Sequence, residues 1–231
     1  MPSTPFQLIV TGKAEVAHLA ELAIINVSVS SSGINEASVS DKVITTAKHI
    51  ESLLGPLSPQ DDTAKAKKAA PIAHWSKTSL SSTSHGLYHH QDPDQPPIRQ
   101  YNVAISFDIS FRDFQALRSF GTKLSSISHV EVQNISWILT DATLKSFETE
   151  LREKAAQDAL EKACDYCDVL AYKANVRPVE LQEATVSRSM QQAKIGIGNG
   201  EYARTEGLRF DAQKVKMAIE VTVKFEADYD V

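Results

Sequence analysis

Hydrophobic and polar residues alternate with period two in several parts of the chain, as in strands that bury one face of a sheet. The clearest run covers 101–111, where every second residue is aromatic or aliphatic. Residues 22–30 show the same alternation, with Ile25, Val27 and Val29 on one side. Weaker forms of the pattern predict further strands over 6–16, 72–83, 130–139, 179–186 and 215–225.

Three other segments repeat apolar residues every three or four positions, which predicts helices. The best of them begins after Asn35, a residue suited to capping a helix, and ends at Gly55-Pro56. Its apolar stripe consists of Val39, Val43, Ala47, Ile50 and Leu54. A short helix is predicted over 113–126, and a long one over 143–174 after a capping Thr140 or Asp141.

These elements predict an α+β fold: mostly antiparallel sheet of about seven strands, with three helices packed on one face. We expect a single domain over 6–225, with tails at 1–5 and 226–231. Polar residues, prolines and glycines predict a loop over 57–70 and long polar insertions at 84–98 and 187–213.

The amino-acid composition limits the kinds of partner and the cellular compartment that we expect. The chain has 231 residues, a net charge of −5 and 42% hydrophobic residues, which excludes wholesale disorder. The acidic balance disfavours nucleic acid as a partner. No apolar run is long enough to cross a membrane, and the first residues lack the features of a secretory signal. Two cysteines cannot form a disulfide framework, so we expect a soluble protein of a reducing, intracellular compartment.

Cys164 and Cys167 form a CxxC pair, which in redox proteins begins at a helix N-terminus. Here about twenty predicted helical residues precede the pair, and no second CxxC completes a zinc site. We expect both cysteines on the apolar face of the helix as buried structural residues, with a redox role as the alternative. That face also contains Ala156, Leu160, Ala163 and Ala171.

The segment from His85 to Asp94 concentrates side chains of metal-ligand type. Gly86 and the prolines that follow argue against the helix that would order them, so a polar loop is favoured and metal binding is the alternative. The residues concerned are His85, His89, His90, Asp92 and Asp94.

Two further clusters of residues resemble binding motifs but do not fulfil the requirements of a binding site. Gly196 to Glu201 is glycine-rich but lacks the spacing and strand–helix context of nucleotide-binding loops. Lys65, Lys67 and Lys68 lie near Trp75 but are too few for a nucleic-acid surface. No nucleophile elbow or other catalytic constellation is present, so we predict no catalytic residue, no metal site, no cofactor and no enzymatic activity.

Several segments resemble the SIMPL domain family. VTGKAEV at 10–16 is similar to the family's opening VxGxGxV strand, with Ala14 at the second glycine. The strand that starts at Tyr101 and ends at Asp113 is also similar. NISWILTD at 134–141 followed by DALEKA at 158–163 resembles the family's aromatic strand, Ser/Thr-Asp cap and DAxxKA helix.

The resemblance implies an α+β fold without established enzymatic chemistry. Bacterial relatives look like exported ring-forming or stress-linked envelope proteins, and animal relatives like signalling adaptors of the cytoplasm or nucleus. The intracellular branch is the closer analogue of this chain. Physically, the alanines of DALEKA allow the helix to lie close to a sheet, and we expect Asp158 and Lys162 to form an exposed pair of a few tenths of a kcal/mol.

Two functional hypotheses follow. The leading one is a non-enzymatic protein-interaction and oligomerisation module, a signalling or stress-response adaptor, which associates through exposed strands at 72–83 and 101–111. We expect a homo-oligomer or a protein partner of unknown identity, and neither nucleic acid nor membrane. The alternative is a metal- or small-ligand-binding protein that uses the His85–Asp94 loop, with Cys164 and Cys167 redox-sensitive.

Overall fold

The computed structural model describes residues 6–87, 98–170, 175–189, 192–194 and 210–227. Its internal contacts divide the chain into two compact units. Unit 1 contains residues 1–19, 139–190 and 214–231, and unit 2 contains residues 20–138 and 191–213. Each unit has its own antiparallel sheet and its own buried core, within the span for which the sequence predicts one domain.

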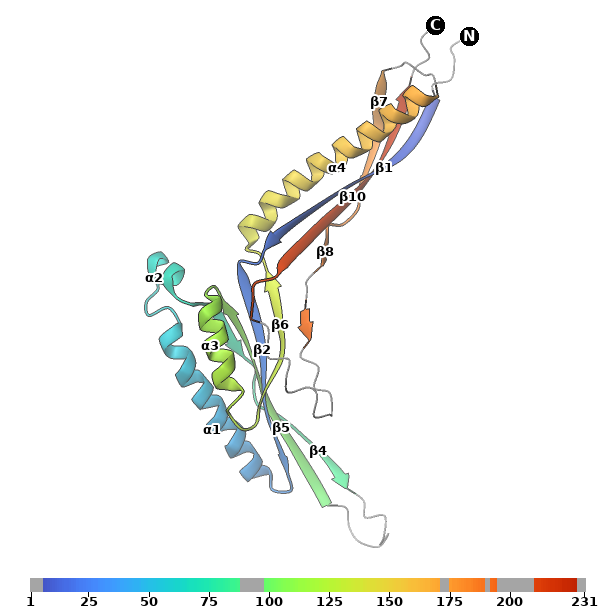
Figure 1. The fold of residues 1–231 in the computed structure, drawn as a ribbon. Helices are drawn as coiled ribbons and strands as arrows, with labels where there is room; N and C mark the ends of the chain where they lie inside the picture. Colours follow the sequence, from blue (N-terminus) through green and yellow to red (C-terminus); the bar gives the residue numbers. More distant parts are fainter. Residues whose placement is uncertain (1–5, 88–97, 171–174, 190–191, 195–209, 228–231) are drawn as a thin grey trace. The chain divides into compact units, whose positions relative to one another are not determined.

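Unit 1 is a sheet with one helix that runs along its strands (Figure 1). Strand β10 (Lys214–Ala227) is central, between β1 (Phe6–Leu19) and β7 (Val176–Glu183), and β8 (Ser187–Ser189) also pairs with it. Helix α4 (Asp141–Val169) packs mainly against β1 and β10. Every second residue of β10 is buried from Val215 to Ala227, as expected for a strand with one covered face.

Unit 2 contains the larger sheet, in the order β3-β5-β2-β6-β9, with β4 beside β5. Helices α1 (Glu36–Leu54) and α3 (Phe114–Leu124) lie on the same side of this sheet (Figure 1). The strands are β2 (Leu22–Gly33), β3 (Ile72–Lys77), β4 (Ser81–Leu87), β5 (Ile98–Phe111), β6 (Val130–Ile138) and β9 (Gln192–Lys194).

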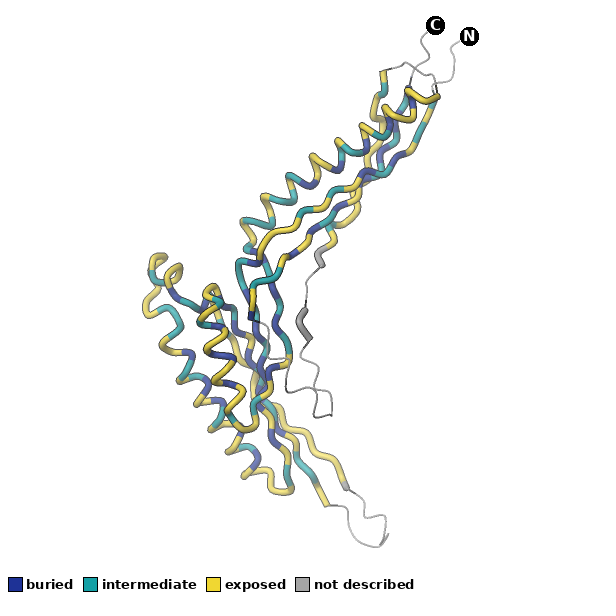
Figure 2. Tube along the Cα trace, in the orientation of Figure 1, coloured by how far each residue is buried: buried dark blue, intermediate teal, exposed yellow. Residues whose placement is uncertain are grey.

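The patterns that were strongest in the sequence are confirmed. Asn35 caps α1, its side chain accepting the Ser38 N–H at 3.1 Å, and the 3₁₀ turn η1 (Gly55–Leu57) follows the helix. Alternate residues of β5 are buried from Val103 to Phe111 (Figure 2). The buried residues of α1 are the five of the predicted stripe: Val39, Val43, Ala47, Ile50 and Leu54.

The α+β class is confirmed, but some segments predicted as loops are ordered. Helix α2 (Ala64–Ala69) interrupts the 57–70 loop because Thr63 caps it and alanine and lysine favour helix. Within 84–98, residues 84–87 belong to β4, and 88–97 lie outside the described residues. Within 187–213, β8 and β9 pair with β10 and β6. Those short strands could not be predicted, since their partners lie far away in the sequence.

Candidate interaction site

The residues of the predicted metal-binding alternative are only partly described. His85 lies in β4, where its ring Nδ1 is 3.4 Å from the Asn102 side-chain amide. His89, His90, Asp92 and Asp94 lie outside the described residues. Within the part of the chain that the structure describes, no three His, Cys, Asp or Glu side chains are grouped as metal ligands. The structure therefore adds no geometry to this alternative.

The two cysteines differ in environment. Cys167 is 2% exposed, whereas Cys164 is exposed, and both are free thiols. Burial raises the pKa of Cys167, with smaller contributions from Cys164 and Asp168, so this thiol stays protonated and unreactive.

The expectation that both cysteines share the apolar face of the helix is wrong for Cys164. The buried residues of α4 recur every four positions from Leu151 through Ala163 to Cys167. A residue that follows one of them directly is turned by about 100°. Cys164 and Leu160 therefore lie beside the buried row, and both are exposed. Ala171 lies outside the described residues.

The two remaining sequence clusters form no site among the described residues. Residues 196–201 lie outside that part of the chain. Lys65, Lys67 and Lys68 are exposed on α2, and the Lys67 ammonium is 3.0 Å from the Asp62 carboxylate. The centre of the Trp75 ring lies 6.3 Å from that of the Phe107 ring, so packing against Phe107 explains the presence of this tryptophan.

Asp158 and Lys162 of α4 form hydrogen bonds with backbone groups on the edge of β1 that faces away from β10. Asp158 Oδ2 accepts the backbone N–H of Lys13 at 2.7 Å and also lies 2.6 Å from Lys162 Nζ. Lys162 Nζ donates to the backbone carbonyl of Thr11 at 3.1 Å. These two backbone groups point away from β10, so the side chains satisfy them as a neighbouring strand would. The pair is thus an edge clamp rather than only the exposed surface pair that the sequence predicts.

Gly12 explains how the helix comes close enough for this clamp. A Cβ at this position would lie 2.0 Å from the Ala155 carbonyl oxygen and 2.8 Å from Ala159 Cβ. The VTGK segment of β1 (10–13) and the DALEKA segment of α4 (158–163) therefore pack closely against each other. The signal that could have revealed it was a lone glycine in a strand, which often marks a close approach of another backbone.

Other sheet edges are protected by other means. In β7, Pro178 lies opposite Phe225, beside a register irregularity, and proline offers no N–H to an incoming strand. In β3, the register shifts between Ile72 and His74, and Lys77 pairs with Glu51 of α1. Strand β9 has only three residues. Each is a known way of blocking the addition of another strand.

Strand β4 has none of these protections. It contains neither proline nor lysine, its register with β5 is continuous from Ser81 to Leu87, and residues 81–86 are exposed. No element of the described chain pairs with its outer side. The predicted strand at 72–83 is divided in the structure into β3 and β4, and only residues 81–83 of it belong to the open edge. For 101–111 the prediction of an exposed edge is wrong, because β5 is paired on both sides, with β2 and with β3 and β4.

The direction of the backbone groups of β4 follows from its partner. Ser106 of β5 accepts the Thr78 N–H at 2.9 Å, so the even-numbered residues of β5 point toward this edge. Thr83 lies opposite Asn102 and therefore bonds to β5. Ser82 and Ser84, between such positions, direct their N–H and C=O groups outward. The outer side of β4, from Ser81 to Gly86, is the candidate interaction site.

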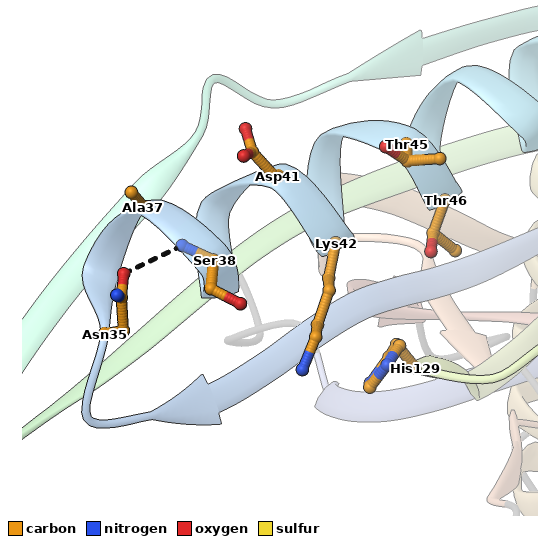
Figure 3. A pocket seen from close by; sticks show the side chains of 8 residues that line it. All are labelled: Asn35, Ala37, Ser38, Asp41, Lys42, Thr45, Thr46 and His129. Atoms are coloured by element: carbon orange, nitrogen blue, oxygen red, sulfur yellow. Dashed lines mark hydrogen bonds between the residues drawn. The ribbon is translucent and has the colours of Figure 1, made fainter.

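Two polar grooves lie in unit 2. One, of about 470 Å³, is lined by hydroxyl and amide side chains of three strands, among them Ser32, Thr83 and Asn102. The other, of about 580 Å³, lies between α1 and His129 (Figure 3). His129 borders both grooves.

No helix among the described residues combines the length and apolar character needed to cross a bilayer. No curated protein matches the chain significantly. The family model SIMPL, described as "Protein of unknown function (DUF541)", matches residues 8–225. This match contains both sides of the Gly12 contact and all four helices described above, and the chain therefore belongs to the SIMPL family.

Proposed function

We propose that this protein is a non-enzymatic protein-interaction and oligomerisation module, a signalling or stress-response adaptor, that associates through strand addition at β4. The observation that carries the proposal is the contrast among the sheet edges. The edge of β1 is clamped, β7 carries Pro178, and β4 is long, exposed and regular. An open edge of this kind is a template for pairing with another strand.

The partner we propose is a second copy of the chain, paired antiparallel through β4. Such a contact is self-complementary about a two-fold axis. Ser81 to Gly86 has the sequence SSTSHG, which contains no Asp, Glu, Lys or Arg, although the chain has a net charge of −5. The residues of β4 itself therefore add no like-charge repulsion when two copies meet, while the Glu36 carboxylate of α1 accepts a hydrogen bond from Ser82 Oγ at 3.2 Å. Facing hydroxyls form favourable cross-strand pairs.

The same proposal places the protein in the cytoplasm or nucleus, as a module without a catalytic centre. The two free cysteines fit a reducing compartment. The residues that carry the family motifs serve packing, because a side chain at Gly12 would collide with Ala155 and Ala159 of α4.

The experiment is native mass spectrometry of untagged protein, comparing wild type with Ser84→Pro and Ser84→Thr. Proline at position 84 removes an N–H that β4 does not use within its own sheet, so the fold is retained. Threonine keeps that N–H and the hydroxyl. We expect dimers for wild type and Ser84→Thr, and monomers for Ser84→Pro with an unchanged circular dichroism spectrum.

A Ser84→Pro protein that dimerises as wild type does would contradict pairing at β4. A wild-type protein that is monomeric over the whole accessible concentration range would contradict the second copy as partner. In that case a hetero-partner whose binding Ser84→Pro abolishes would still support the edge as the interaction site.

A further inference from the structure

The groove between α1 and His129 is a second site, separate from the β4 edge (Figure 3). Its α1 wall consists of polar side chains of the first three helical turns, and the imidazole of His129 lies opposite. Ser38, Lys42 and Thr46 lie on the side of α1 that is nearer His129, whereas Thr45 lies on the same side as Asp41 (Figure 3).

His129 is held in an unusual backbone conformation. Its φ is 68°, the left-handed region, and no other non-glycine residue of the described chain has a positive φ. Histidine adopts this region more readily than most residues, but glycine and asparagine do so more easily. The carbonyl of His129 accepts the Ser30 N–H at 2.9 Å, which ties the turn to β2. The histidine is therefore fixed at its backbone while its ring faces α1 (Figure 3).

The groups that face the groove are mainly hydrogen-bond donors. The Lys42 ammonium and the His129 ring point into the same space, and neither has a side-chain partner within the described chain (Figure 3). The Asn35 side-chain oxygen accepts the Ser38 N–H, and this side chain lies at the end of the groove that is remote from His129 (Figure 3). Asp41, the carboxylate at the rim, projects away from Lys42 and His129 (Figure 3).

We propose that this groove binds an oxyanion of the phosphate type, with Lys42 and His129 as its principal contacts. A compact ammonium beside hydroxyl donors and an imidazole suits a multiply charged anion with several acceptor oxygens. The amide of Ser38 is occupied by the cap, so binding depends on side chains and not on the helix terminus. The groove is open to solvent, since its lining residues are exposed except for the half-buried Thr46, so a small hydrated anion can reach it.

The test is a titration of ¹⁵N-labelled full-length protein with inorganic phosphate at constant ionic strength, followed by two-dimensional NMR. We expect saturable shifts at the His129 ring and at the amides of the first three turns of α1. Lys42→Glu should weaken binding by about tenfold or more, because a charged hydrogen-bond partner is lost. Lys48→Glu is the matched control, since Lys48 is exposed on the same helix and does not line the groove.

His129→Asn removes the ring while keeping a residue that tolerates the left-handed backbone, so it should fold and bind phosphate weakly. Acetate, titrated in parallel, distinguishes a phosphate-type site from a general carboxylate site. Shifts that stay linear in phosphate, or an equal loss in Lys42→Glu and Lys48→Glu, would overturn the site. Acetate binding as tight as phosphate binding would overturn the assignment of the ligand.

Discussion

Gly12 is the residue at which β1 and α4 come closest. A methyl group there would lie 2.0 Å from the Ala155 carbonyl oxygen, so strand or helix backbone must move to admit it. We expect Gly12→Ala to destabilise the protein by about 3 kcal/mol, at the upper end of overpacking effects. Urea unfolding measures the change.

Gly55 supplies the control for this substitution. A Cβ at Gly55 meets nothing within 4 Å, and its φ of −48° is helical. Gly55→Ala should therefore be neutral or stabilising by less than about 1 kcal/mol. If the two variants had equal stability, the close contact at Gly12 would not be a determinant of the fold.

Asp158 provides a pH-dependent prediction. Its hydrogen bond with Lys162, and next that with the Lys13 N–H, hold the pKa of this carboxyl below its ordinary value of 3.8. A lowered native pKa means stability that is present above the ordinary value and lost as pH falls through the native one. Asp158→Asn should therefore be less stable than wild type at pH 7, and the difference should shrink below pH 3.8.

Urea unfolding of both proteins at pH 7 and at acidic pH measures that difference. Asp61 and Glu226 also have lowered pKa values, from hydrogen bonds with Thr63 and with Arg177. Their contribution is common to wild type and variant and cancels in the comparison. A difference between the two proteins that does not depend on pH would show that Asp158 does not act as a charged clamp.

At the scale of an element, helix α4 exposes one of its two cysteines and buries the other. Cys167 belongs to the buried row, and Cys164 lies one residue beyond the buried Ala163. We expect native protein to titrate one thiol with a disulfide reagent at neutral pH, and two after unfolding. Cys164→Ala should abolish the native reaction, while Cys167→Ala should leave it unchanged. Two fast thiols in native protein would contradict the burial of Cys167.

The open edge of β4 is likewise a property of a whole element, because a strand forms an edge only where no other strand pairs with one of its sides. The sequence predicted one strand over 72–83, where the structure has β3 and β4, and one over 101–111, without showing their neighbours. Only the pairing of β5 on both sides made 101–111 internal and left β4 open. The Ser84→Pro comparison therefore tests a property that the register of β4 with β5 establishes.

At the scale of the molecule, two compact units arise from one interleaved chain. Unit 1 combines the first nineteen residues with 139–190 and 214–231, so β1 pairs with a strand about two hundred residues away. Gly12 lies opposite Val221, and no local pattern specifies that register. The sequence therefore predicted β1, β7 and β10 as elements, but neither β8 nor the sheet that the four strands form.

By itself the sequence determined what depends on near neighbours: the apolar stripe and cap of α1, the alternation of β5 and the α+β class. These are local because helical and strand periodicities place side chains on faces whatever the chain does elsewhere. The tertiary structure alone decided which edges are clamped or open, how Asp158 and Lys162 are used, and that His129 faces Lys42. Such features join residues distant in sequence, and their energies arise only when packing brings the groups within contact distance.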